Sequence, residues 1–340
     1  MRRQRKWKKY SARASASNSR KLCMDLSIII VTYKAKDKLR VTLDAVFASQ
    51  TSYSYEVIVV DNASEDGTLE MLQEEFLFVE NGRDNALERF RTSTPVSTGR
   101  AGGPSDKALS APVFLIKNSN EGFSKANNRG IAQAKGEYIL ILNPDTKVSP
   151  DTLEIMLDFM KSRPEVGIAT CKLVAADGSL DLACRRSFPN PASAFYRFSG
   201  LSLLFPHSKK IASYNRTYED DNRDMEIDAC NGAFMLISPA CRKAIKGFDE
   251  DFFMYDEDID LCLRAHEAGF KVWYYPKTTT VHFKGQPYKS SQHSLKVFHQ
   301  SKWIYYKKHL AKNYPGIFNG LIFLAIWLHY GLKSIQNFFR

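Results

Sequence analysis

The sequence predicts an α/β protein built on a mostly parallel sheet flanked by helices. Two apolar runs near the start, Leu26–Tyr33 and Glu56–Val60, have the composition of strands that are buried on both faces. The apolar residues of 39–47 lie between them at the spacing of one face of an amphipathic helix. A strand, a helix and a strand in this order form a right-handed parallel unit. A third buried run, Glu137–Leu142, continues the sheet.

Composition and charge divide the chain into a body and two basic ends. The chain is 44% hydrophobic and 25% charged, as in globular proteins, and its net charge is +11. Of the 48 Lys and Arg residues, 18 lie in residues 1–21 and 284–340, which contain no Asp or Glu; 30 therefore remain beside 37 acidic residues. An acidic body is unlike a nucleic-acid groove, so we expect no nucleic acid partner. The basic ends fit an anionic membrane surface.

These features predict three segments: a basic flexible tail (1–24), one folded domain (25–285) and a basic, aromatic helical extension (286–340). The six cysteines contain no C-x-x-C pair, which favours free buried thiols in a reducing compartment. The basic start runs into Ser, Ala and Asn rather than an apolar segment, so we see no signal peptide. We expect a protein that faces the cytoplasm.

The second predicted strand ends in the sequence D-N-A-S-E-D-G-T, residues 61–68. Ligands of open parallel sheets bind at the carboxyl ends of strands, so Asp61 is a candidate for binding a ribose hydroxyl or a base. The alternative is a turn and helix cap, which we assign to Ser64 and Asp66.

Residues 80–111 are rich in Gly, Ser, Thr and Pro and predict a long surface loop, an insertion rather than a lid.

A short strand, Val113–Ile116, leads into the sequence N-S-N-E-G-F-S-K-A-N-N-R-G-I of residues 118–131, whose spacing from Phe123 is helical. Gly122 at this turn lets a ligand approach the backbone, and the N-terminus of the helix favours a phosphate. The segment is neither a G-x-G-x-x-G motif nor a P-loop, so it gives no support to a dinucleotide or ATP site.

The run Glu137–Leu142 ends in N-P-D-T, which places Asp145 at the carboxyl end of another strand. A carboxylate beside the phosphates of a nucleotide is how proteins hold Mg²⁺ or Mn²⁺. N-P-D-T is also a good turn, and both interpretations hold together.

A strand and a hairpin follow Gly167. For Arg185 and Arg186 we favour a surface position over contact with a diphosphate.

After a predicted strand, residues 230–237, the stretch 247–282 contains six carboxylates from Asp249 to Asp258, and then a helical pattern from Ile259. An acid cluster at the start of an apolar helix is suited to general base catalysis because part of it is desolvated. The alternative is that these carboxylates only complement the helix dipole. A β-rich run then leads to His282.

Residues 317–332 are largely apolar but slightly short of the ~20 residues that span a bilayer. Asn319, His329 and the flanking lysines favour a helix that lies in the plane of the membrane surface over one that crosses it. A helix packed on the body remains the alternative.

In this order the motifs resemble those of the inverting glycosyltransferase family 2. They are S-I-I-I-V-T-Y-K, V-D-N-A-S-E-D-G-T, N-E-G-F-S-K-A-N-N-R-G-I, I-L-N-P-D-T, N-G-A-F-M-L-I, and G-F-D-E-D-F-F-M-Y-D-E-D-I-D-L-C-L-R closing on V-H-F-K-G. They cover roughly residues 25–285 and are most similar to rhamnosyltransferase-like enzymes of bacterial surface polysaccharide synthesis. The resemblance implies the GT-A fold. The insertion at 80–111 departs from the family pattern.

The resemblance also implies a role for each matching residue. Asp258 is the expected catalytic base, and Asp145 and His282 are the expected ligands of Mg²⁺ or Mn²⁺. Asn143 occupies the first position of the family's D-x-D motif and is expected to hydrogen-bond rather than to bind the ion. The expected nucleotide-sugar-binding residues are Thr32, Asp61, Asn62, Asn120, Gly122, Asn127, Asn143 and Arg264.

The expected activity is inverting transfer of a sugar, first rhamnose, from a dTDP or UDP donor to a glycan or polyprenyl-diphosphate-linked acceptor. This reaction takes place at the cytoplasmic face of the plasma membrane, where the enzyme is peripheral. Alternatives are transfer of another hexose (glucose, galactose or galactofuranose) and a non-catalytic subunit that binds a nucleotide sugar. A nucleotidyltransferase is less well supported, because residues 31–38 (V-T-Y-K-A-K-D-K) lack the glycines of its phosphate loop.

Overall fold

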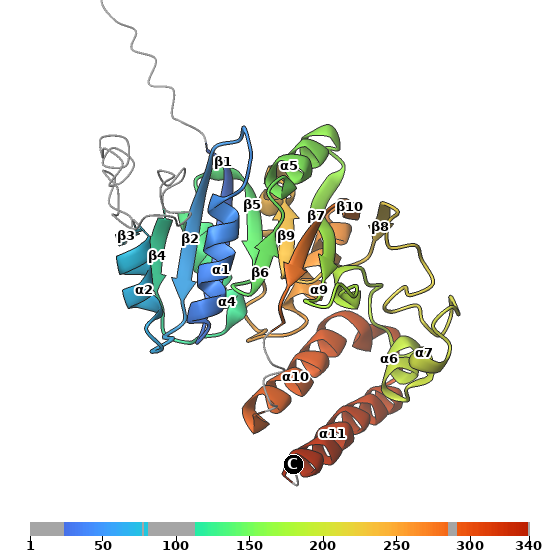
Figure 1. The fold of residues 1–340 in the computed structure, drawn as a ribbon. Helices are drawn as coiled ribbons and strands as arrows, with labels where there is room; N and C mark the ends of the chain where they lie inside the picture. The colour runs from blue at the N-terminus through green and yellow to red at the C-terminus, as the bar shows by residue number, and fades with distance from the viewer. Residues whose placement is uncertain (1–23, 77, 81–112, 285–290, 339–340) are drawn as a thin grey trace, which may run out of the picture.

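The computed structural model describes residues 24–76, 78–80, 113–284 and 291–338. Residues 1–23 and 81–112 lie outside this part, so the predicted tail and nearly all of the predicted insertion have no structural description here. The described chain forms one twisted sheet with helices on both faces and a pair of long helices at one end (Figure 1).

The first half of the sheet is parallel, as predicted. Its strands are β1 (Met24–Thr32), β2 (Tyr55–Asp61), β3 (Phe78–Glu80), β4 (Val113–Lys117) and β5 (Gly136–Leu142). In β1 and β2 almost every residue is buried, which explains their continuous apolar runs. The register pairs Thr32 with Asp61, so both side chains stand at the same carboxyl edge. β3 has no counterpart in the sequence prediction.

The second half of the sheet is mixed. It contains β6 (Thr146–Val148), β7 (Val166–Val174), β8 (Met225–Ile227), β9 (Phe234–Ile237) and β10 (Lys271–His282). The order across the sheet is β3-β4-β2-β1-β5-β9-β7-β10-β6, with β8 beside β10. β9 runs antiparallel to both β5 and β7, and β10 is antiparallel to β6 but parallel to β7. β1 to β5, β7 and β10 thus run in one direction and β6, β8 and β9 in the other, so the sheet is mostly parallel, as predicted.

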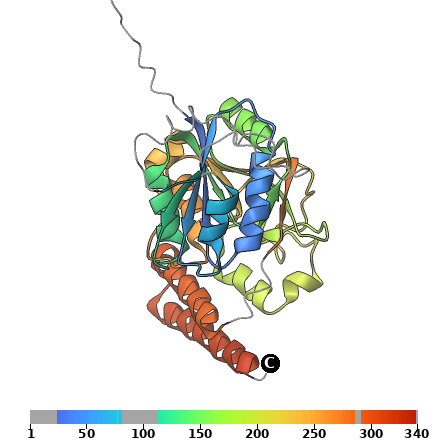
Figure 2. The same cartoon turned by 60° about the vertical axis from the view of Figure 1, so that its left-hand side comes forward.

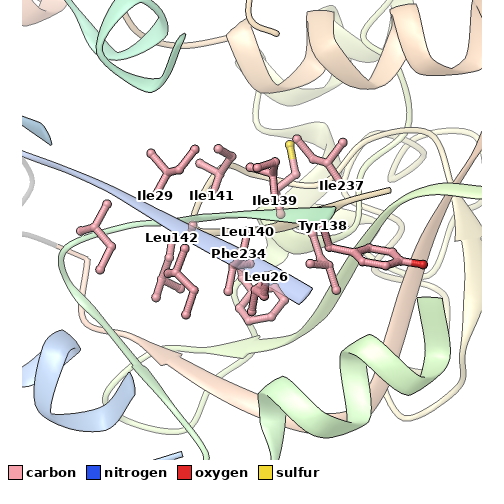
Figure 3. Close-up of a cluster of buried hydrophobic side chains, with 14 of the residues drawn as sticks. Leu26, Ile29, Tyr138, Ile139, Leu140, Ile141, Leu142, Phe234 and Ile237 are labelled. Atoms are coloured by element: carbon pink, nitrogen blue, oxygen red, sulfur yellow. The ribbon is translucent and has the colours of Figure 1, made fainter. Parts of the chain in front are cut away.

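Helices cover both faces of the sheet (Figure 2). The helices that lie beside the sheet are α1 (Lys36–Phe47), α2 (Thr68–Glu75), α4 (Phe123–Gln133), α5 (Thr152–Ser162), α8 (Pro239–Ile245) and α9 (Glu257–Glu267). Two short helices, α6 (Pro191–Phe198) and α7 (Leu201–Leu204), lie outside the sheet, as do α10 (Gln292–Tyr305) and α11 (Gly316–Phe338). At the centre, side chains of β1, β5 and β9 form a dry core around Ile29, Ile141 and Phe234 (Figure 3).

The five cysteines in the described part of the chain, Cys171, Cys184, Cys230, Cys241 and Cys262, are buried and not paired in disulfides, as predicted. The predicted surface position of Arg185 and Arg186 is wrong, since their exposed fractions are 2% and 8%. Arg185 donates to the carbonyl oxygens of Glu219 and Asp220, and Arg186 donates to an acid and to a carbonyl. Their positive charge is therefore paired inside the fold.

Candidate active site

The carboxyl ends of β1, β2 and β4 gather buried polar side chains. Asn118 donates its side-chain N–H to Asn62 at 2.6 Å, and the backbone N–H groups of Asn62 and Asn118 bond to Thr32 and Asp61. Four oxygens here have no hydrogen-bond partner within the described chain: Oγ1 of Thr32 and Oδ1 of Asp61, Asn118 and Asn127. Such orphaned groups are costly unless a ligand satisfies them. The edge is therefore preformed for a polar molecule.

Asp61 is 2% exposed, and burial raises the pKa of its carboxyl against the hydrogen bond from Ser64. Its Oδ1 has no partner within the described chain and can accept a hydrogen bond, which suits a ribose hydroxyl or a donor on a base edge. Of the other residues predicted to bind the nucleotide, Asn120 is exposed in the loop before α4. Arg264 lies on α9, where it donates to Asp260 at 2.8 Å and to the carbonyl of Ile245 at 2.7 Å.

Gly122 is required for a reason different from the one predicted. Its φ of +98° is unfavourable for other residues, and a Cβ there would lie 2.5 Å from the carbonyl oxygen of Phe253. That same oxygen accepts a hydrogen bond from the N–H of Phe123. The close approach at the start of α4 is thus made by the chain itself, and it ties the edge of β4 to the acidic stretch before α9.

A second cluster surrounds His282 at the end of β10. Its Nε2 lies 3.3 Å from Oδ1 of Asp145, and its Nδ1 lies 2.9 Å from Oδ2 of Asp181. Antiparallel pairing of β10 with β6 produces this contact, because His282 is opposite Thr146. Asn143 precedes Asp145 in the same turn, and its backbone N–H bonds to the carbonyl of Ala233. The predicted pair of Asp145 and His282 is therefore assembled.

Asp181 was not predicted. It is 2% exposed and accepts hydrogen bonds from the side chains of His282, Lys284 and Asn231. Burial opposes its ionisation, but the bonds from His282 and Lys284 outweigh burial and lower the pKa of Asp181. Burial likewise opposes protonation of His282, whose contacts with Asp145 and Asp181 raise its pKa to about 9. The two carboxylates around the His282 ring thus favour a positive charge on or beside it.

The Asp145–His282 pair fits a divalent cation. Two ligands of one octahedral ion at about 2.1 Å lie about 3 Å apart, close to the 3.3 Å between these atoms. Asp181 on the far nitrogen would be the outer carboxylate that orients His282 if this histidine held a metal ion. Within the described residues no group of three or more His, Cys, Asp or Glu can hold a metal. An ion here would need oxygens from a bound diphosphate as further ligands.

The acidic stretch ends in a strained turn that positions Asp258. Tyr255 and Asp256 both have left-handed backbone angles, with φ of +72° and +63°. Lys302 of α10 donates to Asp256 at 2.5 Å and holds this turn from outside the domain. Asp258 follows in the first turn of α9 and is 8% exposed. Strain of this kind persists where surrounding contacts over-determine it, which is typical of functional sites.

Asp258 and Glu257 have different environments. Oδ2 of Asp258 accepts a hydrogen bond from Arg186 at 2.7 Å, and Oδ1 accepts one from the N–H of Ile259. Glu257 has no such cation, and its Oε2 has no partner within the described chain. Burial, then the charge of Asp258, raises the pKa of Glu257 well above its usual range. Of the two carboxylates, Asp258 is the one that an arginine holds.

A chain of contacts joins the two clusters. Arg186 bonds both Asp258 and the carbonyl oxygen of Cys230, and the next residue, Asn231, donates to Asp181. Asp181 in turn holds His282. The segment N-G-A, residues 231–233, thus runs between the acid of α9 and the His282 cluster. A cavity of about 210 Å³ opens beside Asp258 and is lined also by Arg186, α6 and α10.

We expect Arg186→Met to lower the free energy of unfolding by about 3 kcal/mol or more, because it leaves the Asp258 carboxylate buried without a cation. Urea denaturation measures this loss. Arg223→Met is the matched control: Arg223 is exposed, so the same substitution there should change stability by less than about 0.5 kcal/mol. Equal urea denaturation midpoints for the two variants would show that the Arg186–Asp258 ion pair does not contribute this stability.

Comparisons with known proteins bear on this site. The family described as "Glycosyltransferase like family 2" matches residues 106–305, and "Glycosyl transferase family 2" matches residues 27–85. Rhamnosyltransferase WbbL of Escherichia coli is 31% identical over 180 residues, 51% of this chain and 65% of WbbL. The N-acetylglucosaminyl-diphospho-decaprenol L-rhamnosyltransferase of Mycobacterium tuberculosis is 25% identical over 245 residues, 64% of this chain and 79% of that enzyme.

Two solved structures share the fold. The mannosyltransferase PcManGT of Pyrobaculum calidifontis, in complex with GDP-Man and Mn²⁺, superposes with a TM-score of 0.51 at 16% identity over 92% of this chain and 72% of that chain. GalNAc-T7 with UDP, GalNAc and Mn²⁺ gives 0.52 at 14% identity over 84% and 49%. The chain has a GT-A-like fold and belongs to glycosyltransferase family 2.

Proposed function

We propose that this glycosyltransferase moves a sugar, with inversion, from a nucleoside diphosphate to a lipid-linked acceptor at a membrane surface. The observation that carries the proposal is the contact chain from Asp258 through Arg186, Asn231 and Asp181 to His282. This chain of contacts joins the carboxylate of Asp258 to the Asp145–His282 pair, which supports a shared role for them on one donor. The orphaned oxygens at the ends of β1, β2 and β4 supply the polar surface for a nucleotide.

In the proposed donor complex, Asp61 and Thr32 bind the nucleoside, and Asn118, not predicted from sequence, orients Asn62 beside them. Asn127 and Asn143 are proposed to contact the donor further along this edge, and Arg264 and Asn120 keep their proposed roles in donor binding. Asp145 and His282 would hold a Mg²⁺ or Mn²⁺ ion. When bound, that ion neutralises the diphosphate that leaves with the bonding electrons of the anomeric carbon–oxygen bond.

Asp258 is proposed to act as the general base. Each of its oxygens accepts one hydrogen bond within the protein, so each retains a lone pair for the acceptor hydroxyl. The hydroxyl gives its proton to Asp258, and its oxygen attacks the anomeric carbon from the face opposite the diphosphate. Arg186 fixes the carboxylate in place during this transfer. The products are an inverted glycoside, a nucleoside diphosphate and a proton on Asp258.

The choice of sugar and acceptor rests on the relatives. A rhamnosyl donor is proposed because WbbL and the mycobacterial enzyme are named rhamnosyltransferases. A polyprenyl-diphosphate-linked acceptor is proposed because the name of the second relative describes a diphospho-decaprenol substrate. The cavity beside Asp258 would then hold the acceptor sugar.

Membrane association at the cytoplasmic face is proposed from α11. This helix of 23 residues is long and apolar enough by composition to cross a membrane, and none of its residues is buried. Its contacts with α10 favour a position in the plane of the surface, as the sequence suggested. Gln292 and His299 of α10 and Tyr306, directly after it, bond to Ser334, His329 and Asn319 in antiparallel order along α11.

The test is to incubate the purified protein and a lipid-diphosphate acceptor with a panel of nucleotide sugars, with and without Mn²⁺. We expect free nucleoside diphosphate and a glycosylated lipid from one donor, first dTDP-rhamnose. Pyrophosphate as product would instead indicate a nucleotidyltransferase. Binding of a nucleotide sugar without release of any nucleotide would indicate a non-catalytic subunit.

A further inference from the structure

A stripe of apolar side chains on α11 faces away from the protein. The stripe consists of side chains spaced by three or four residues, each at least 55% exposed: Ile317, Leu321, Leu324, Leu328, Leu332 and Ile335. This spacing places them on one face of the helix. The opposite face packs on α10, where the ring of Phe323 contacts Trp303 and the OH of Tyr306 donates to Asn319.

The helices α6 and α7 extend this apolar surface. Phe195, Phe198, Leu203, Leu204 and Phe205 are between 49% and 81% exposed, although none of them was singled out by the sequence. The ring of Phe198 lies 4.9 Å from that of His329, so α6 touches the middle of α11. Figure 1 shows α6 and α7 beside α11 at the same end of the molecule. Phe198 thus joins the two segments, which we together call the apolar platform (α6, α7, residue 205 and the exposed stripe of α11).

The charge around the platform matches an anionic bilayer. Residues 191–211 contain Arg197, Lys209 and Lys210 and no acidic residue. Residues 291–338 contain six lysines, two of which (Lys302 and Lys308) pair with acids of the body, and no acidic residue. Lys209 and Lys210 are exposed directly after the apolar side chains of α7. Apolar side chains flanked by basic ones bind the boundary between acyl chains and anionic headgroups. A protein partner on the platform would instead need an apolar centre surrounded by acidic residues.

The platform also borders the cavity beside Asp258. Ser193, Ala194, Arg197 and Phe198 of α6 line this cavity together with Asp258. We propose that α6 and α7 are a second bilayer contact, continuous with α11, that holds the mouth of the Asp258 cavity at the surface of an anionic membrane. This inference deepens the proposed function and rests on it for the use of a lipid-linked acceptor. The contact itself is independent of any sugar transfer.

Sedimentation of the purified full chain with vesicles tests the proposal without measuring activity. With vesicles of phosphatidylcholine and phosphatidylglycerol, we expect Leu203→Asp and Leu204→Asp together to reduce partitioning by at least about tenfold, since burial of each leucine is lost. Leu328→Asp on α11 should reduce it as well. All three leucines are at least 60% exposed, so these variants should fold. Val41→Asp on α1, also an exposed apolar residue, is the matched control and should bind as the wild type does.

The role of charge is tested by Lys209→Gln with Lys210→Gln on vesicles with and without phosphatidylglycerol. We expect a loss of the phosphatidylglycerol-dependent binding, whereas Lys243→Gln with Lys277→Gln should retain it. Wild-type partitioning of the Leu203→Asp, Leu204→Asp variant would overturn the proposal. So would a dimer in solution that this variant disrupts while vesicle binding is unchanged, because the platform would then be an interface between two copies. A vesicle-binding chain that transfers no sugar would instead refute only the proposed function.

Discussion

Asp258→Asn is expected to reduce sugar transfer by about 10²- to 10⁴-fold while binding of the nucleoside diphosphate is unchanged. The amide cannot accept the proton of the acceptor hydroxyl, but it has nearly the same shape and still accepts a hydrogen bond from Arg186. The proposed nucleoside contacts at the edge of β1, β2 and β4 are made by other residues and should not respond. Initial rates at saturating donor, together with calorimetric titration of the nucleoside diphosphate, separate the two effects.

Asp251→Asn is the control for this variant. Asp251 belongs to the same acidic stretch, but its side chain is 70% exposed and pairs with Lys308 at the surface. It should therefore retain full transfer. A melting temperature measured for both variants shows whether either one has lost its fold. Near wild-type turnover of a folded Asp258→Asn variant would remove Asp258 from the role of base.

Asp145→Asn is expected to abolish the effect of Mn²⁺ on nucleoside diphosphate binding and to lower transfer by at least about 10²-fold. The amide is a weaker ligand for a hard cation, and only His282 would remain on the protein side. Calorimetric titration of the nucleoside diphosphate with and without Mn²⁺ measures the difference directly. The wild type should bind more tightly with the ion, and the variant should bind equally weakly in both conditions.

Asp177→Asn serves as the control, because Asp177 is an exposed carboxylate that bonds only to Ser179 in its own turn. It should keep the full Mn²⁺ effect. If Asp145→Asn also keeps it, the ion is bound elsewhere and the pairing of Asp145 with His282 has another purpose.

The elements of the first half of the fold were predictable because their pattern is local. β1, β2 and β5 are buried on both faces, so each is a continuous apolar run in the sequence. The sequence of antiparallel β9 resembles that of a parallel strand, because all of its residues are buried. Its direction is set by long-range pairing with β5 and β7, which no local pattern shows.

The site was predicted only where a motif marks it. Asp145 was named from its place at the end of a strand and His282 through the family resemblance, and the structure places them in contact. Asp181 and Arg186 were missed because their importance comes from partners about a hundred and about seventy residues away. Arg186 stands in a polar segment where arginine is normally at the surface. The one available signal was that Asp258, a buried acid, requires a cation that the sequence nearby does not provide.

The central claim is that Asp145, His282 and Asp258 act on one nucleotide sugar. A crystal structure with Mn²⁺ and a nucleoside diphosphate tests it most directly, since anomalous scattering locates the ion. We predict a manganese peak about 2.1 Å from an oxygen of Asp145 and from Nε2 of His282, with the nucleoside against Asp61 and the terminal phosphate directed toward the cavity of Asp258. A nucleotide and ion bound away from the Asp145–His282 pair would contradict the account.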